Sequence, residues 1–511
     1  MAKEPSAVTG RGYDGAMGKK QRASAARTSS ADQRAIAEGL SALDAALEQL
    51  WESIRAGDVL GAEVQASEML ALPGMADDSD ESHVRVVTGL IRRAASVLEP
   101  PEQAAFLRLL VALGTKAVKR RASDELADLA DDGVYPPEWV TDIGKAVPGQ
   151  AYRARDAFGE QELVAVSFSY GDAEHMIAVA LDLAELPTVV LAGVNTNSAK
   201  FFKEVEGDET FGGRLEPITV AEARQRVEGP LANYGSDPDY GLDPTSMFAL
   251  PLIRARLRRL PAPDPGASAT YTAADRAAAV ADFEASPFAA EAGHPDVARF
   301  WAQVLTGYSS RVPGEAPATV GRHRLAAALV LHVPRTFLLS PEQRDGMRQA
   351  VTAWTRWAAA RQGIDEESAG ALMTHLDVDF GDFPAAYDAP ESSVLRGYVQ
   401  DLATPDVDLA WLAEARARRE LAAPPPDDRH PDDEDADPAD PAGRAVLVAS
   451  EFGSCDLEGA DADEFMAAVT RVAEELWRDD PPATWQKGKS LLAKGHDPHD
   501  VIHLLVEATS W

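Results

Sequence analysis

Three histidines near the end of the sequence are the residues best suited to chemistry. They are His496, His499 and His503, in the segment KGHDPHDVIHLLVEA at 494–508. His499 and His503 stand four positions apart, so a helix would place both on one face. Imidazole pairs with this spacing bind one metal ion in the H-E-x-x-H zinc proteases. Here the second position of the pattern holds Asp500, which is one methylene shorter than the glutamate base of those enzymes.

The supply of further ligands decides whether such a pair can trap an ion. Glu507 follows on the same stripe, but it lies ~12 Å from His499 along a helix axis at ~1.5 Å per residue. Both cannot ligate one ion, because ligand atoms lie ~2 Å from the metal. A site would have to borrow a ligand from His496 or from another segment. We therefore assign no cofactor, and keep a divalent metal at His499 and His503, with His496 as a weaker third candidate, as the alternative.

The elements that must position these histidines are readable from the same segment. Asp497 and Pro498 are typical of a helix N-cap and first turn, and Gly495 is typical of the end of the preceding helix. At 100° per residue, Val501, Leu504 and Leu505 gather on one side. The histidines lie roughly opposite, and we expect them to face solvent, another domain or a ligand. A polar or partner-facing stripe is the simpler interpretation of them.

Other segments with chemical residues give weaker signals. THLDVDFGDF at 374–383 offers His375, Asp377, Asp379 and Asp382, but their spacing does not match a calcium-binding loop, and we expect a capped loop after a helix at 366–375. Gly10-x-Gly12-x-x-Gly15 lacks the preceding strand that a dinucleotide fingerprint requires. The single Cys455 has acidic neighbours, which disfavour its thiolate. We assign no catalytic residue, and any ligand pocket or small-molecule ligand is left open.

Hydrophobic periodicity predicts a mainly α multidomain protein with a central α+β domain and a small helical module at its C-terminus. Runs such as ELVAVSFSY and HMIAVALDL, separated by Gly171-Asp172, predict an antiparallel hairpin, and Thr188–Val194 predicts a third strand. Stretches rich in Pro, Gly or acidic residues interrupt the periodic segments, and we place the domain boundaries at these stretches. The expected segments are a disordered basic tail at 1–33, a helical bundle or hairpin array at 34–132, an α+β domain with an antiparallel sheet at 135–260, a helical domain at 268–422, an acidic Pro/Asp linker at 423–443 and a helical module at 444–511.

Charge and composition limit the classes of binding partner that we expect. The net charge of −34 disfavours a general nucleic-acid binder, because phosphate backbones require a basic surface. The basic tail and KAVKRRAS at 116–123 keep nucleic-acid contact only as a minor alternative. No apolar run approaches the ~20 residues that span a bilayer, and no secretory signal is present, so we expect no membrane partner. A single cysteine fits a reducing compartment, and we expect a cytoplasmic location.

Parts of the sequence resemble uncharacterised proteins of high-GC bacteria. The similarity is carried by PPEWV at 136–140, by VSFSYGDAEHMIAVALDL at 166–183 and by the ending DDPPATWQKGKSLLAKGHDPHDVIHLLVEA. The ending is similar to a short C-terminal domain of unknown function that carries a His-Asp-x-x-His-like helix. The resemblance implies that His499 and His503 occupy the histidine positions of that helix, and it implies no activity, substrate or cofactor.

These observations favour a non-enzymatic interaction or regulatory protein whose partner is another protein. Helical arrays and an acidic tether are typical of proteins that bind partners, although helical bundles are also built simply as cores. The alternative is a metal-dependent hydrolase that uses His499 and His503, with Asp500 as a possible base.

Overall fold

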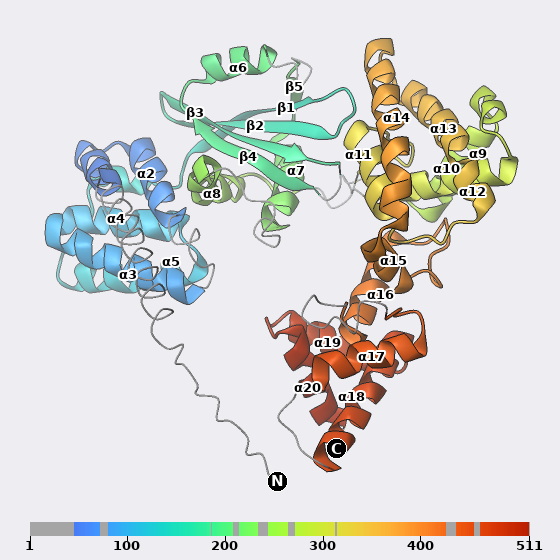
Figure 1. Cartoon of the computed structure of the whole chain (residues 1–511). Helices are drawn as coiled ribbons and strands as arrows, with labels where there is room; N and C mark the ends of the chain where they lie inside the picture. The colour runs from blue at the N-terminus through green and yellow to red at the C-terminus, as the bar shows by residue number, and fades with distance from the viewer. Residues whose placement is uncertain are drawn as a thin grey trace, which may run out of the picture.

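The computed structural model describes residues 45–71, 80–184, 187–207, 214–233, 244–263, 271–311, 314–425, 436–453 and 460–509. The expected basic tail at 1–33, residues 426–435 of the acidic linker, the glycine motif at 10–15 and Cys455 lie outside these residues. The described chain is mainly α with one central antiparallel sheet, which confirms the predicted fold class. Helical units flank the sheet, and the C-terminal module lies below the second of them (Figure 1).

The N-terminal unit is a helical bundle. It contains helical residues 45–56, α2 (Val59–Ala71), α3 (Asp80–Val97), α4 (Pro100–Leu113) and α5 (Lys116–Asp131), and it ends in the 3-10 turn η2 (Glu138–Asp142). Leu47, Leu50 and Ile54 recur at helical spacing and are all buried. Trp51 meets Phe106 of α4 edge to face, with ring centroids 5.3 Å apart. The bundle therefore buries the apolar stripe that its sequence periodicity predicts.

The central sheet has the strand order β4-β3-β2-β1-β5, and every neighbouring pair is antiparallel. Its strands are β1 (Val147–Arg155), β2 (Gln161–Tyr170), β3 (Ala173–Asp182), β4 (Thr188–Asn195) and β5 (Glu216–Ile218). The helices α7 (Val220–Asn233) and α8 (Pro244–Leu257) cover one face, and α6 (Ser198–Glu206) covers the other (Figure 1). The predicted hairpin and third strand are β2, β3 and β4.

The edge strand β4 contains no charged residue, and Val190 and Leu191 are exposed on it. Its register with β3 shifts between Ala180 and Leu181. The backbone N–H of Ala192 donates to the buried Ser246 Oγ of α8 across 3.0 Å. A helix hydroxyl thus satisfies one donor of this strand.

The second helical unit has its own core. It comprises α9 (Ala273–Glu284), η4 (Pro287–Glu291), α10 (Pro295–Ser309), α11 (Arg322–Ala326), the π-helical turn η5 (Ala327–His332), α12 (Pro341–Asp345), α13 (Met347–Gln362) and α14 (Glu366–Asp388). Trp301, Trp354 and Phe283 are buried in its centre. The expected loop after residue 375 is wrong, because α14 continues through it. Leu376, Phe380 and Phe383 recur at helical spacing there, and their burial outweighs the helix-breaking tendency of Pro384.

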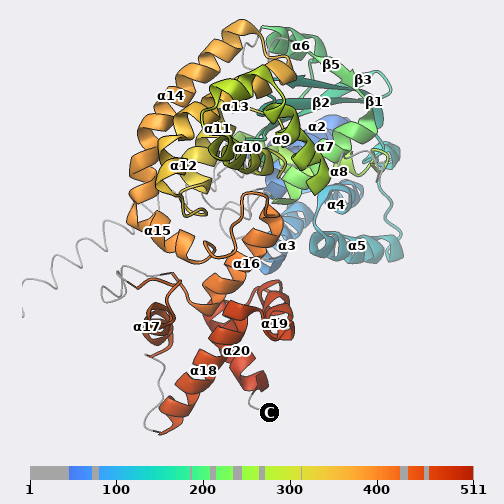
Figure 2. The same ribbon diagram turned by 90° about the vertical axis from the view of Figure 1, so that its right-hand side faces the viewer.

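The C-terminal module contains α17 (Pro441–Phe452), α18 (Ala460–Arg478), α19 (Pro482–Leu492) and α20 (Pro498–Thr509). It lies at one end of the molecule in both views (Figures 1 and 2). Its core extends past the predicted 444–511 segment, because α15 (Pro390–Gly397) leads into α16 (Leu409–Ala422), whose Leu412 and Leu421 pack with it. Among the described helices, none combines the length and apolarity needed to cross a bilayer.

Candidate functional site

His499 and His503 face each other on α20. The helix begins at Pro498, and Asp497 Oδ1 accepts a hydrogen bond from the His499 backbone N–H across 2.9 Å. The capped first turn fixes the direction of the helix. The two Nε2 atoms are 3.0 Å apart, and the ring centroids are 4.8 Å apart. The four-residue spacing therefore brings the two imidazoles into direct contact.

Two neighbouring helices hold the rings in this arrangement. Phe452 of α17 stacks on His499 at 4.7 Å between centroids, and Phe465 of α18 stacks on His503 at 5.0 Å. Glu451 Oε1 lies 2.8 Å from His499 Nδ1. The histidine stripe thus faces α17 and α18 rather than a distant domain. About a third of the His499 side chain, 33%, stays exposed.

The arrangement permits two hydrogen-bonding states. In one, His503 Nε2–H donates to His499 Nε2, and His499 Nδ1–H donates to the Glu451 carboxylate. In the other, both Nε2 lone pairs point to a common cation, and Glu451 still accepts from Nδ1. Burial lowers the pKa of His503, and the adjacent His499 lowers it further. Both effects favour the neutral imidazole that a metal ligand requires.

His496 is separate from this pair. It is exposed at the break before α20. Within the described ranges, no group of three or more His, Cys, Asp or Glu side chains is placed to hold a metal ion. The described part of the chain therefore supplies two imidazoles and one supporting carboxylate at this position.

The aspartates and histidine at 374–383 do not converge on one point. They lie along α14, where Asp377 pairs with Arg348 at 2.6 Å and His375 Nε2 lies 3.3 Å from an Arg322 guanidinium nitrogen. Asp379 is buried. Burial raises its pKa to about 6, and the neighbouring Asp382 acts in the same direction.

A second polar cluster, which sequence reasoning missed, lies between the N-terminal bundle and the sheet. Arg256 of α8 pairs with Glu63 of α2 and donates from Nε to His175 Nε2 of β3 across 2.9 Å. Tyr170 O–H donates to both Glu63 carboxylate oxygens at 2.9 Å. Glu63, Arg256 and His175 are fully buried. No local motif marks these residues, because they come from segments far apart in the sequence.

The electrostatics of this cluster keep His175 neutral. Burial lowers its pKa to about 3, and the positive charge of Arg256 acts in the same direction. A neutral ring can accept from Arg256 at Nε2. Burial also raises the pKa of Tyr170, so its phenol remains a donor to Glu63. The cluster is therefore a buried ion pair that joins α2, the sheet and α8, and within it His175 Nδ1 has no hydrogen-bond partner.

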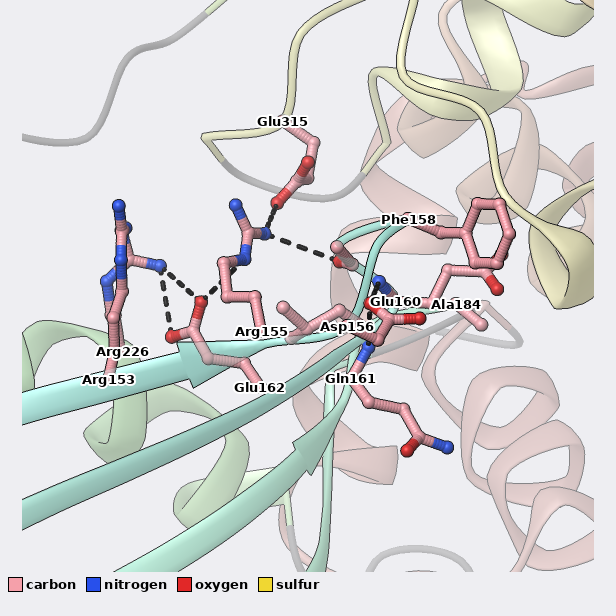
Figure 3. A network of polar contacts seen from close by, with 12 residues as sticks. Arg153, Arg155, Asp156, Phe158, Glu160, Gln161, Glu162, Ala184, Arg226 and Glu315 are labelled. Atoms are coloured by element: carbon pink, nitrogen blue, oxygen red, sulfur yellow. Dashed lines mark hydrogen bonds and ion pairs between the residues drawn. The ribbon is translucent and has the colours of Figure 1, made fainter. Parts of the chain in front are cut away.

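A third cluster joins the sheet to the second helical unit (Figure 3). Glu162 of β2 pairs with Arg155 of β1 at 3.0 Å and with Arg226 of α7 at 2.9 Å. Arg155 also pairs with Glu315, in the segment that precedes α11, at 2.6 Å. The Arg155–Glu315 pair therefore links the sheet to the second helical unit across their boundary.

Glu160, in the turn between β1 and β2, is the centre of that boundary. Its carboxylate accepts from the backbone N–H groups of His323 at 3.1 Å and Arg324 at 2.6 Å. Burial opposes its ionisation, but these hydrogen bonds and the His323 side chain outweigh burial, so its pKa lies below the ordinary value. A Cβ on Gly321 would lie 2.3 Å from Glu160 Oε1, which explains the glycine there.

Comparison with known proteins adds no further site residue, because no protein-family model, no curated protein and no solved structure matches this sequence.

Proposed function

We propose that this chain is a non-enzymatic interaction or regulatory protein of the cytoplasm. The observation that supports this proposal best is that buried charged side chains connect the separate units of the chain. Glu63–Arg256 ties the N-terminal bundle to α8 and the sheet, and Glu160 ties the sheet to α11. Removing one partner of a buried pair costs about 3–5 kcal/mol, so the units cannot easily turn relative to one another. A frame with fixed units is suited to presenting surfaces to a partner.

The junction between the second helical unit and the C-terminal module is the surface that we assign to a partner protein. Leu409 of α16 packs against both cores, and Arg416 donates to the Arg335 carbonyl. On the segments that meet there, three apolar side chains are exposed: Leu331 by 38%, Leu338 by 68% and Trp411 by 49%. Exposed tryptophan is enriched among residues that dominate binding energy at protein interfaces.

The cytoplasmic location and the bacterial setting belong to the same proposal. The single cysteine allows no intrachain disulfide, as expected in a reducing compartment. The resemblance of the chain ending to a domain of unknown function from high-GC bacteria is consistent with that setting and assigns no activity.

The test is affinity purification of the tagged full chain from native cells at low salt. We expect a stoichiometric partner with the wild type and a loss of that partner with Trp411→Asp. Val378→Asp is the matched control, because Val378 is also apolar and exposed, by 59%, but lies on α14. Repeated recovery of the lone chain would contradict the proposal, as would equal loss of the partner in both variants.

A metal-dependent hydrolase is the second candidate, and the approach of the two Nε2 atoms to 3.0 Å favours it. Asp500 would act as base, and it is exposed next to His499. Activity on ester or phosphoester probes that needs added metal and is lost in His499→Asn would support this candidate. Metal-loaded protein that hydrolyses none of these probes faster than His499→Asn would rule it out.

A further inference from the structure

We propose that His499 and His503 form a two-imidazole chelate for one divalent transition-metal ion, with Glu451 as its supporting carboxylate. The site requires metal binding only, and it stands whether the chain binds a partner or hydrolyses a substrate. The two Nε2 atoms already lie 3.0 Å apart. A cation can take the place of the proton that the pair would otherwise share, after His503 moves its remaining N–H to Nδ1.

The distance between the nitrogens indicates which ion fits. An ion ~2.05 Å from each nitrogen would subtend an angle of about 94° at the metal. Adjacent ligands of tetragonal or octahedral ions stand about 90° apart, whereas tetrahedral ions require about 109°. The pair therefore matches two adjacent positions of Cu²⁺ or Ni²⁺ better than it matches tetrahedral Zn²⁺. Divalent copper also binds most tightly to nitrogen ligands in the general order of first-row metals.

The ring orientations are fixed before any ion arrives. Glu451 lies 2.8 Å from His499 Nδ1, the carboxylate–histidine arrangement that orients a metal-bound imidazole and raises its basicity. Phe452 and Phe465 stack on the two rings at interplanar angles of 26° each. Binding would therefore cost little ordering of side chains.

Solvent can complete the coordination. The side chains of His499 and Glu451 are 33% and 32% exposed, so the pair is open on one side. Because the described residues add no third ligand in a suitable group, we assign the remaining positions to water. Such a site holds its ion reversibly.

The experiment is titration of the full chain with CuCl₂, NiCl₂ and ZnCl₂, followed by calorimetry and by electron paramagnetic resonance of the copper form. We expect one equivalent of Cu²⁺ with two equatorial imidazole nitrogens, and weaker Ni²⁺ and Zn²⁺ binding. His499→Asn or His503→Asn should remove that equivalent. Glu451→Gln should keep it with an affinity about 10- to 100-fold lower.

His496→Asn is the matched control, because this exposed histidine lies in the same segment and outside the pair. It should bind Cu²⁺ as the wild type does. Retention of the equivalent in His503→Asn, or an equal loss in His496→Asn, would overturn the proposal. The wild-type copper spectrum decides the matter even if the pair variants fold poorly, since absence of coupling to two nitrogens would also overturn it.

Discussion

Arg256 donates a hydrogen bond to His175 across 2.9 Å, in a position where neither side chain reaches solvent. The same guanidinium neutralises Glu63, so one arginine connects an N-terminal helix, the sheet and α8. Two aromatic rings enclose it, because its Cζ lies 5.7 Å from the Phe168 centroid and 5.4 Å from the Tyr170 centroid. The cohesion of the first two units depends on this contact.

Replacement of Arg256 by methionine should lower the free energy of unfolding by about 3–5 kcal/mol, because it leaves the Glu63 carboxylate buried without its cation. Glu63→Gln/Arg256→Met should recover part of that loss. Urea unfolding followed by tryptophan fluorescence measures both. Arg120→Met, on the exposed side of α5, is the control and should change little. Equal stability of Arg256→Met and Arg120→Met would contradict the assigned role.

Stability should fall as the pH drops from about 6.5 towards 3. Burial and, to a smaller extent, neighbouring arginines lower the pKa of His175 and of His332 to about 3. Below the unfolded pKa of about 6.5, the unfolded chain therefore binds protons that the folded chain does not. Each histidine should contribute a slope of about 1.4 kcal/mol per pH unit in this range. The free energy of unfolding in urea at pH 7.5, 6.5, 5.5 and 4.5 tests this slope. His332→Gln should lower the slope by the contribution of one histidine. A slope unchanged by that substitution would contradict it.

The contribution of Asp379 to stability should change with pH in the opposite direction to that of the histidines. Burial and then Asp382 raise its pKa to about 6, with His323 opposing, so the folded state disfavours the carboxylate at neutral pH. Asp379→Asn should stabilise the chain by about 1 kcal/mol at pH 7, and most of this gain should be lost by pH 4, where the folded carboxyl is protonated and the unfolded carboxyl is about half protonated. Thermal unfolding at pH 7 and pH 4 gives the comparison. The exposed Asp377→Asn is the control, and a pH-independent effect at Asp379 would count against the explanation.

Glu160→Gln should weaken the contact between the sheet and the second helical unit. The neutral amide loses the charge that favours the His323 and Arg324 N–H donors, which should cost about 1–3 kcal/mol. The hydrogen bond to Glu160 raises the pKa of His323, so this pKa should fall in the variant. Histidine NMR titration measures it, with exposed Glu174→Gln as the control. An unchanged His323 titration would show that the contact does not form.

Part of the fold was predictable because it is local. Strand β2, the Gly171 turn and strand β3 follow from apolar runs and one left-handed glycine, with φ 58°. Strand β1 was missed, since VPGQAYRAR combines Pro148 and Gly149 with two arginines and shows no apolar run. Residues beyond 375 were wrongly assigned to a capped loop, whereas packing of Phe380 and Phe383 keeps the helix intact through Gly381 and Pro384.

The candidate site was likewise predictable only in its local part. The four-residue spacing predicted that His499 and His503 share a helix face. Their contacts with Glu451 and Phe465 depend on how α17 and α18 pack on α20, and no spacing rule specifies this packing. For the same reason the Glu63–Arg256 and Glu160–Arg324 contacts could be found only in three dimensions.

The Ser246 hydroxyl at the rim of the sheet has a consequence for assembly. An uncharged strand such as TVVLAGVN offers a template on which a strand from another molecule could extend the sheet. A newcomer would have to displace the hydroxyl from the Ala192 amide, and it would meet an interrupted ladder at the register shift opposite Leu181. The apolar edge strand β4 is therefore protected against edge-to-edge association by the Ser246 side chain and by its own register shift, although it carries no charged residue.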